Sequence, residues 1–152
     1  MYILKPEERE FIGWFWGEGC LMIQRVTSKN SKKGNFYYRP VMVIAQRDDD
    51  ADILKWCQKR FGGQLERRAK TNNTNPRASW RLIGFKGCQE VVKVLSQGVL
   101  PSKKKRELVI FKEFLSSKLG SGKVMSSEID QKFNLLRNQL RFLKIYNPSL
   151  SS

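Results

Sequence analysis

The sequence predicts an α+β domain in which four antiparallel strands are covered by helices on one face. Helical and extended patterns alternate in the order αββαββα, with helical segments trailing them. Each pair of extended segments is separated by a polar, turn-rich stretch, which is typical of a hairpin and therefore of antiparallel pairing. The length of 152 residues suits one domain over 1–152, with its core at about 5–119.

The first half of the chain is one αββα unit. Pro6 precedes a dense apolar helix, which Gly17 and Gly19 are expected to break. A run of aspartates gives the second helix an acidic N-terminus, and two glycines after residue 61 end it. The predicted elements are a helix over 7–16, strands over 20–26 and 36–46, and a helix from 48 to 60.

The second half repeats the hairpin and ends in helices. Gly98 is expected to stop the first of these helices, and Ser102 to cap the next. Apolar residues at 91, 92, 94 and 95 form the buried face of the first one. The predicted elements are strands over 64–70 and 79–83, and helices over 87–97, 103–119 and about 126–143.

The composition favours a polyanion as partner. Lysine and arginine number 29 against 14 aspartates and glutamates, which gives a formal charge of +15. The chain is still 40% hydrophobic, so it can bury a core, and it has no apolar run long enough to span a membrane. We therefore expect a soluble, intracellular protein with no membrane partner.

Its three cysteines lack a C-x-x-C pair and are expected to be reduced thiols, mostly buried.

The sequence contains no histidine. Its absence excludes Ser-His-Asp and Cys-His catalysis and the ordinary zinc hydrolase sites. Any hydrolysis must use carboxylates, a hard metal ion, lysine and water.

The first helix ends in a Gly-x-x-x-Gly-Glu-Gly pattern from Gly13 to Gly19, with Glu18 as its one acid. This pattern resembles the signature of the LAGLIDADG homing endonucleases, although large aromatic side chains at 14–16 depart from it. A buried helix that ends in glycines gives a similar string. The resemblance implies a saddle-shaped sheet and two signature helices packed together, and the order of elements supports it to about Leu119.

The resemblance also implies roles for particular residues. Because the chain has one copy of the signature, it implies a homodimer in which Gly13, Trp14 and Gly17 pack against the partner. Glu18 and Gly17 would hold Mg²⁺, for which Ca²⁺ or Mn²⁺ could substitute in binding or cleavage. The catalytic set would be completed by Gln46, which orders water near the metal, and by Lys103, which steadies negative charge.

Each of these assignments has an alternative in the sequence. Lys104 and Lys105 have the same chemistry as Lys103, and the whole basic run could contact phosphate or simply be solvated. The aspartates at 48–50, together with Asp52, form a rival acid cluster, which helix capping explains as well as a metal does.

Alternation along the strands predicts which residues lie on the open face of the sheet. Polar outward rows are generic in half-exposed sheets, but the charge of +15 favours contact with base edges in a major groove. The predicted DNA-binding residues are Gln24, Val26, Ser28, Tyr37, Arg39, Gln64, Glu66, Arg68, Lys70, Ser79 and Arg81.

The sequence therefore predicts a Mg²⁺-dependent, site-specific endonuclease that cuts both strands of double-stranded DNA at a long, near-palindromic site. By the resemblance, its gene would lie in a mobile intron. Two alternatives stay open: a LAGLIDADG-type binder without cleavage, such as an intron RNA maturase or a DNA-binding regulator, and a monomeric basic RNA-binding protein of the ribosomal kind.

Overall fold

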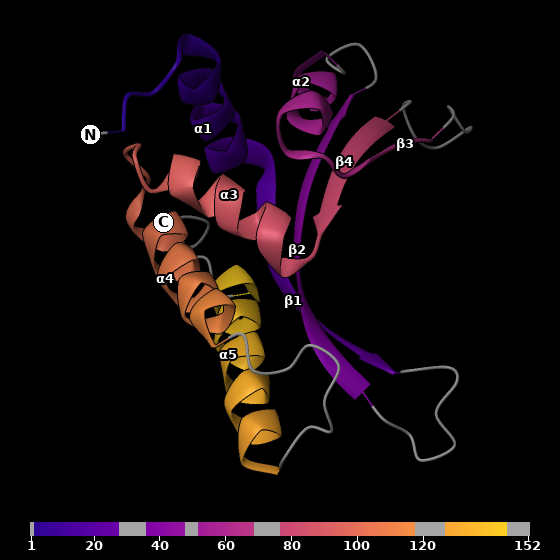
Figure 1. Ribbon diagram of the computed structural model, residues 1–152, viewed down its shortest axis with the longest axis vertical. Coiled ribbons are helices and arrows are strands. Elements are labelled where there is room, and N and C mark those ends of the chain that lie inside the picture. The colour runs from indigo at the N-terminus through magenta and orange to yellow at the C-terminus, as the bar shows by residue number, and fades with distance from the viewer. Residues whose placement is uncertain (1, 28–35, 48–51, 69–76, 118–126, 146–152) are drawn as a thin grey trace.

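The computed structural model describes residues 2–27, 36–47, 52–68, 77–117 and 127–145. They form four strands and five helices in one α+β unit, as the sequence predicts (Figure 1). The elements are α1 (Pro6–Glu18), β1 (Gly19–Thr27), β2 (Phe36–Arg47), α2 (Asp52–Phe61), β3 (Gln64–Arg68), β4 (Arg77–Ile83), α3 (Phe85–Leu95), α4 (Ser102–Ser116) and α5 (Ser127–Ile145).

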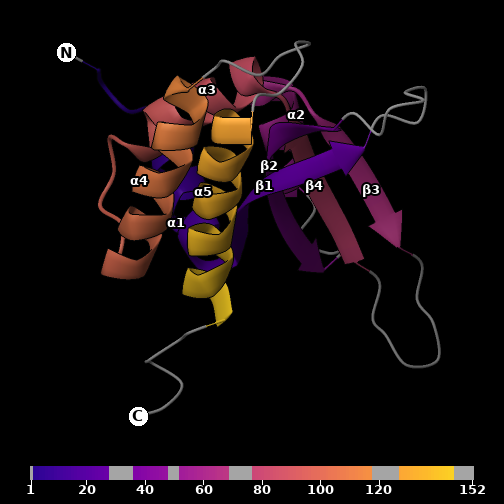
Figure 2. The same cartoon turned by 90° about the horizontal axis from the view of Figure 1, so that it is seen from below.

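The four strands form one antiparallel sheet in the order β1-β2-β4-β3. The helices lie on one side of it, and α4 and α5 are stacked beside each other there (Figure 2). The long β1-β2 hairpin extends beyond the part of the sheet that the shorter β3-β4 hairpin shares. One face of the sheet is therefore packed, and the other is left without a covering layer among the described elements.

Aromatic side chains from three elements form the centre of the core. Phe11 of α1 lies between Trp56 and Phe61 of α2 and Trp80 of β4, with ring centroids 5.2 to 6.3 Å from its own. Trp80 is fully buried, and its indole Nε1 donates a hydrogen bond of 2.8 Å to the carbonyl of Gly62. The chain turns there with Gly62 and Gly63 at positive φ, which glycine adopts without strain. The predicted glycine stop after the second helix is confirmed.

A second aromatic row fastens the C-terminal helices to the sheet. Tyr38 of β2 contacts Phe133 of α5, which contacts Phe114 of α4, and Phe114 contacts Phe85 of α3, with centroids 5.1 to 5.5 Å apart. The Tyr38 hydroxyl donates to Asp130 Oδ1, and burial together with this hydrogen bond raises the pKa of Tyr38 to about 12. The trailing helix is thus part of the core.

The structure corrects three predicted boundaries. Gly17 does not break the first helix, which continues through Glu18, because a single glycine costs a helix only about 1 kcal/mol. Ser102 is the first residue of α4 and not its cap, and Pro101 occupies the cap position with no side-chain hydrogen bond. The helix predicted over 87–97 spans Phe85–Leu95 instead: it begins directly after Gly84 at positive φ and ends before Gly98, with Ser96 as its C-cap.

Burial of the cysteines follows the prediction in the main. Cys57 and Cys88 are fully buried, and burial raises the pKa of each thiol to about 12, whereas Cys20 is half-buried.

Of the helices in the described ranges, none has the length and apolar content that crossing a membrane would require.

Candidate functional site

Glu18 is the last residue of α1, and its side chain is exposed where the helix passes directly into β1. The inner stripe of α1 is buried in the core and consists of Glu8, Phe11, Ile12 and Phe15. This stripe fixes the rotation of the helix, so Glu18 lies outside the core. The carboxylate predicted from the signature therefore stands at an exposed junction between a rigid helix and the edge strand of the sheet.

The outer face of α1 has two glycines whose missing side chains leave open space beside the described residues. A Cβ added at Gly13 or Gly17 would meet no atom within 4 Å. Each glycine costs a helix about 1 kcal/mol relative to alanine. Gly19, by contrast, is required by the fold itself, because its added Cβ would come within 2.5 Å of the Phe15 ring. Packing within the described residues therefore does not account for glycine at 13 and 17.

Of the two tryptophans that flank these glycines, Trp16 is more exposed than the predicted Trp14. Trp16 is 49% exposed and lies three residues after Gly13, whereas Trp14 is half-buried beside the core stripe. Periodicity does not separate the two, because Trp14 and Trp16 lie about 80° to either side of the midpoint between Gly13 and Gly17 on an α-helix.

Lys104 is the lysine that approaches this junction. Its Nζ donates a hydrogen bond of 2.7 Å to the Gly19 carbonyl, next to Glu18, and lies 6.0 Å from the centroid of the Phe15 ring. Glu107, which is 2% exposed, places its Oε2 atom 3.5 Å from the same ammonium. Lys103 is half-buried one residue earlier in the first turn of α4. The sequence does not decide among Lys103, Lys104 and Lys105; in the described residues, Lys104 is the one that makes a hydrogen bond at the end of α1.

The remaining predicted active-site groups are only partly described. The backbone of Gln46 pairs with Ala78 near the end of β2, but its side chain lies outside the described residues. Asp48, Asp49 and Asp50 lie outside them as well, and Asp52 is the first residue of α2. Within the described ranges, no three aspartates, glutamates or cysteines gather as a metal-binding group.

The register places the predicted polar residues on one face of the sheet. Gln24 of β1 is opposite Arg39 of β2, and Val26 is opposite Tyr37. The Arg39 Nε donates a hydrogen bond of 3.0 Å to Gln24 Oε1, so the two side chains lie together. This face is opposite to the one that Leu21, Ile23 and Tyr38 bury under the helices.

The second hairpin continues the same face. Gln64 of β3 pairs with Arg81 of β4, and Glu66 pairs with Ser79. Arg81 Nε is buried and has no hydrogen-bond partner among the described residues. Arg68 pairs through its backbone with Arg77, but its side chain lies outside the description, as do Ser28 and Lys70 entirely.

Arg77 belongs to this face and was not predicted. It is exposed, and its Cα lies opposite Arg47 on one side and Arg68 on the other. The structure begins β4 two residues before the predicted strand, so extending the alternation back from Ser79 would have found it. A hollow of about 380 Å³ beside it is lined by Ala45, Glu66, Arg67, Arg77, Ala78 and Ser79.

The profile of the LAGLIDADG endonuclease family matches residues 11–115, from α1 into α4. The chain belongs to this family. The match covers the signature helix, both hairpins and the lysine run, and stops before α5. A search of curated proteins found no match.

Solved structures of LAGLIDADG proteins have the same fold. The homing endonuclease I-TnaI aligns with a TM-score of 0.71 at 22% identity, over 94% of this chain and 95% of that one. The homing endonuclease I-CvuI, in complex with the I-CreI target in 2 mM Mg, aligns with a TM-score of 0.70 at 17% identity, over 90% of this chain and 81% of that one. The I-LtrWI LAGLIDADG homing endonuclease, bound to target DNA, aligns with a TM-score of 0.71 at 18% identity over 91% of this chain, but over only 46% of its own.

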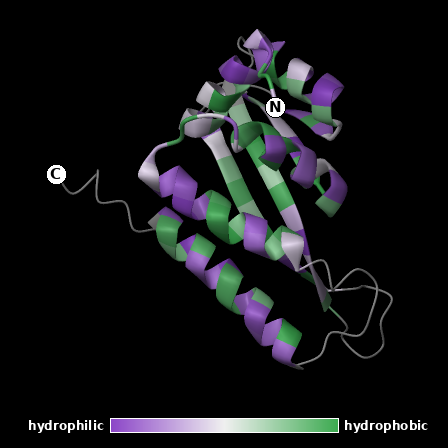
Figure 3. Cartoon of the chain, turned by 60° about the vertical axis from the view of Figure 1, so that its left-hand side comes forward, coloured by the Kyte–Doolittle hydropathy of each residue, from purple (hydrophilic) through white to green (hydrophobic). Residues whose placement is uncertain are grey.

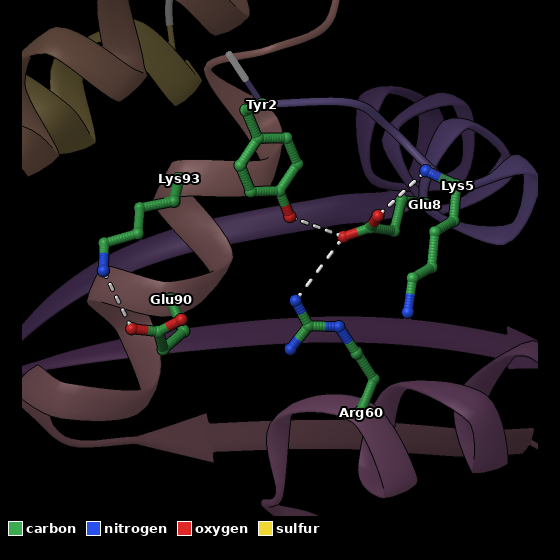
Figure 4. Close-up of polar contacts among 6 residues, drawn as sticks. All are labelled: Tyr2, Lys5, Glu8, Arg60, Glu90 and Lys93. Carbon is green, nitrogen blue, oxygen red and sulfur yellow. Dashed lines mark hydrogen bonds and ion pairs between the residues drawn. The ribbon is translucent and has the colours of Figure 1, made fainter.

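The side of the LAGLIDADG fold away from the open face is held by an N-terminal clasp (Figure 4). Glu8 is 2% exposed and accepts hydrogen bonds from the Tyr2 hydroxyl at 2.7 Å and the Lys5 backbone at 2.9 Å, with Arg60 of α2 at 3.5 Å. Burial acts to raise the pKa of Glu8, but these three partners outweigh it and hold the pKa below its ordinary value. Glu8 is therefore a structural carboxylate, distinct from the exposed Glu18.

Proposed function

We propose that the chain is a metal-dependent endonuclease that acts as a homodimer on double-stranded DNA, at a long site with near-palindromic symmetry. The observation that carries the proposal is the exposed Glu18 at the end of a helix whose outer face presents two unobstructed glycines. A helix of this kind brings its acid next to the acid of a second copy when the two outer faces meet. Twofold symmetry of the protein would then match twofold symmetry of the DNA site.

The dimer is proposed to form through α1. Gly13 and Gly17 would allow the two backbones to approach closely, and Trp16 would lose its exposed area against the partner. The lengths of the relatives support this arrangement. This chain aligns with 46% of I-LtrWI and 47% of I-AabMI, both bound to DNA, so one copy here corresponds to less than half of those chains.

The open face of the sheet is proposed to lie in the major groove. Arg39, Arg77 and Arg81 supply positive charge there, and Glu66 is the one carboxylate among the residues assigned to that face in the described strands. Arginine can donate two hydrogen bonds to guanine, and glutamine can pair with adenine, so this set of side chains has the chemistry of base readout. The hydrogen bond from Arg39 to Gln24 would fix both side chains before DNA binds.

The two Glu18 carboxylates of a dimer are proposed to hold Mg²⁺, with the Gly17 carbonyl as a further oxygen ligand. Carboxylate and carbonyl oxygens are the ligands that this ion prefers. When bound, the cation would neutralise charge on the scissile phosphate and make water a better nucleophile. The residues of the chain would hold the DNA backbone over the dimer axis, and Gln46 would orient water near it.

Lys104, in place of Lys103, is proposed as the lysine that offsets negative charge at the centre. Its ammonium donates a hydrogen bond to the Gly19 carbonyl, and the buried Glu107 lies 3.5 Å from it and helps to orient it. Lys104→Met should therefore lower the cleavage rate more than Lys103→Met. Equal losses, or a greater loss for Lys103→Met measured in single turnovers on the same DNA, would return the role to Lys103.

The central test is Glu18→Gln, which removes the charge and keeps the shape. DNA recovered by cleavage from a randomised library with Mg²⁺ would first give the site. The variant should bind that site with nearly wild-type affinity in Ca²⁺ and cleave it at least about a hundredfold more slowly in Mg²⁺. Glu113→Gln, an exposed acid on α4, is the matched control and should cleave normally.

Two outcomes would overturn the nuclease. One is undiminished cutting by Glu18→Gln. The other is a wild-type protein that binds nucleic acid in Ca²⁺ and never cleaves it in Mg²⁺, which would leave a non-cleaving binder such as an RNA maturase.

The dimer has its own test. The wild type should sediment at twice the chain mass, and Gly13→Leu should shift it toward the monomer, because a branched side chain would separate the two helices. A wild type that stays monomeric at the concentrations that cleave DNA would contradict the proposed site.

A further inference from the structure

An apolar groove of about 750 Å³ lies between α4 and α5, and its exposed lining residues show that it opens away from the core. Figure 3 brings this side forward and shows hydrophobic turns on both helices. Val109 of α4 is 63% exposed, and Leu135 and Phe142 of α5 are 58% and 63% exposed. Helices of a small domain usually bury such side chains in the core. The core-facing sides of α4 and α5 are instead occupied by Phe111, Phe114, Phe133, Leu136 and Leu140, which are buried.

One end of the groove is basic. α4 and α5 follow each other in the chain and run antiparallel, so the first turns of α4 lie beside the last turns of α5 (Figure 1). Lys105 and Arg106 line that end and are exposed. No aspartate or glutamate is among the described residues that line the groove. Its floor is therefore apolar, and its charge has a single sign.

The dimensions fit a short helix. The lining residues of α5 run from Leu135 to Leu143, which is about 12 Å along the helix axis, or roughly two turns. A groove between two helices accepts a third helix through apolar anchors spaced at i, i+3 or i+4, and i+7. The anchors would cover Val109 and Leu135, and acidic residues of the occupant would meet Lys105 and Arg106.

We propose that this groove is the docking site for an amphipathic helix of a partner protein, with acidic residues at the end that meets Lys105 and Arg106. A second copy seated by twofold symmetry would bring its own Lys105 and Arg106 into the same contact, which would then hold basic residues and no acidic ones. RNA fits it poorly as well, because an apolar floor offers a phosphate backbone no partner. The site is separate from Glu18 and from the open face of the sheet, so the proposal does not depend on nuclease activity.

The test uses the whole chain and synthetic peptides. The probe is a fluorescent 14-residue helical peptide with leucines at i, i+4 and i+7 and glutamates at one end. A peptide of the same composition in scrambled order, and one with lysines in place of the glutamates, are the controls. The acidic peptide should bind at least about tenfold more tightly than either control.

Two substitutions locate the site. Leu135→Ser should weaken binding of the acidic peptide at least about tenfold, whereas Val99→Ser should leave it unchanged, since Val99 is 88% exposed outside the groove. Arg106→Glu should weaken the acidic peptide and strengthen the lysine peptide, which is the reversal that complementary charge requires. Both leucine and valine variants replace exposed side chains, so thermal unfolding should confirm that they fold.

Four results would overturn the proposal. The first is equal binding of the acidic and scrambled peptides. The second is a Leu135→Ser variant that binds the acidic peptide as tightly as the wild type does. The third is a Leu135→Ser variant whose sedimenting mass or RNA affinity changes while its peptide affinity does not. The fourth is an increase in peptide affinity of about tenfold or more after removal of residues 146–152, which would show that this segment occupies the groove.

Discussion

At the scale of single residues, Glu8 gives the clearest pH dependence. Its pKa is held below the ordinary value of 4.5, so its ionised form stabilises the fold above that pH, and the contribution is lost as the pH falls through the lowered pKa. Glu8→Gln should reduce the free energy of unfolding by about 1–3 kcal/mol at pH 7. Urea unfolding at pH 7 and pH 3 should show the difference shrinking at the lower pH.

Glu10→Gln is the matched control for that experiment. Glu10 is exposed on the same helix, so the substitution should change stability little at either pH. A Glu8→Gln effect that is the same size at pH 3 would mean that the charge of Glu8 is not what the clasp uses.

The three cysteines should differ in reactivity. The thiolate is the reactive form, and burial holds the pKa of Cys57 and Cys88 at about 12, so these two stay protonated and enclosed. Cys20 is half-buried on the edge strand. Iodoacetamide at pH 8 should therefore label Cys20 first, with the other two labelled only after unfolding, as peptide mass spectrometry would show. Early labelling of Cys57 would contradict the packing of α2 against the sheet.

At the scale of elements, α5 depends on one aromatic side chain. Phe133 is 2% exposed and connects Tyr38 of the sheet to Phe114 of α4. Phe133→Ala should lower the free energy of unfolding by about 3–5 kcal/mol, because it removes this contact and leaves a cavity. Amide hydrogen exchange should show α5 losing protection while α1 keeps it.

Leu135→Ala is the control on the same helix, since Leu135 is 58% exposed and should change stability little. If Phe133→Ala were as mild as this control, α5 would not be part of the cooperative core.

The elements also show how far sequence patterns reach. The order of the strands and helices was predictable because alternation and helical periodicity are local properties of the chain. The ends of α1 and α4 were not, because they depend on tertiary contacts. α1 continues through Gly17 since Phe15 is buried against the sheet, and α4 begins at Ser102 although that residue was expected to cap it.

The site was predictable to the same degree. Glu18 and the open face of the sheet follow from a local signature and from strand alternation, and both predictions of placement on the fold agree with the structure. Our proposal of Lys104 over Lys103 could not be made from the sequence, since it rests on a hydrogen bond between residues 85 positions apart. Arg77 could have been predicted, because it lies on the face that strand alternation defines. The greater exposure of Trp16 than of Trp14 could not, because helical periodicity places the two equally far from Gly13 and Gly17.

At the scale of the whole molecule, the positive charge should act through one face. The excess of cations predicts that affinity for duplex DNA falls steeply with salt, because each phosphate contact releases a counterion. Arg77 lies on the open face, whereas Lys93 lies on α3, where it is 64% exposed and paired with Glu90 (Figure 4). Replacing either residue by alanine removes one positive charge, so a difference between the two variants reports position and not net charge.

Arg77→Ala should lower affinity for nonspecific duplex DNA several-fold and reduce the slope of log K against log salt by about 1. Lys93→Ala should change neither quantity beyond error, because its charge is directed away from the sheet face and is already offset by Glu90. Fluorescence anisotropy between 50 and 200 mM salt measures both quantities on one short duplex, and no knowledge of the target site is needed. Equal losses of DNA affinity in the two variants would mean that affinity depends on the total charge of the protein. That result would contradict the open face of the sheet as the DNA-binding surface.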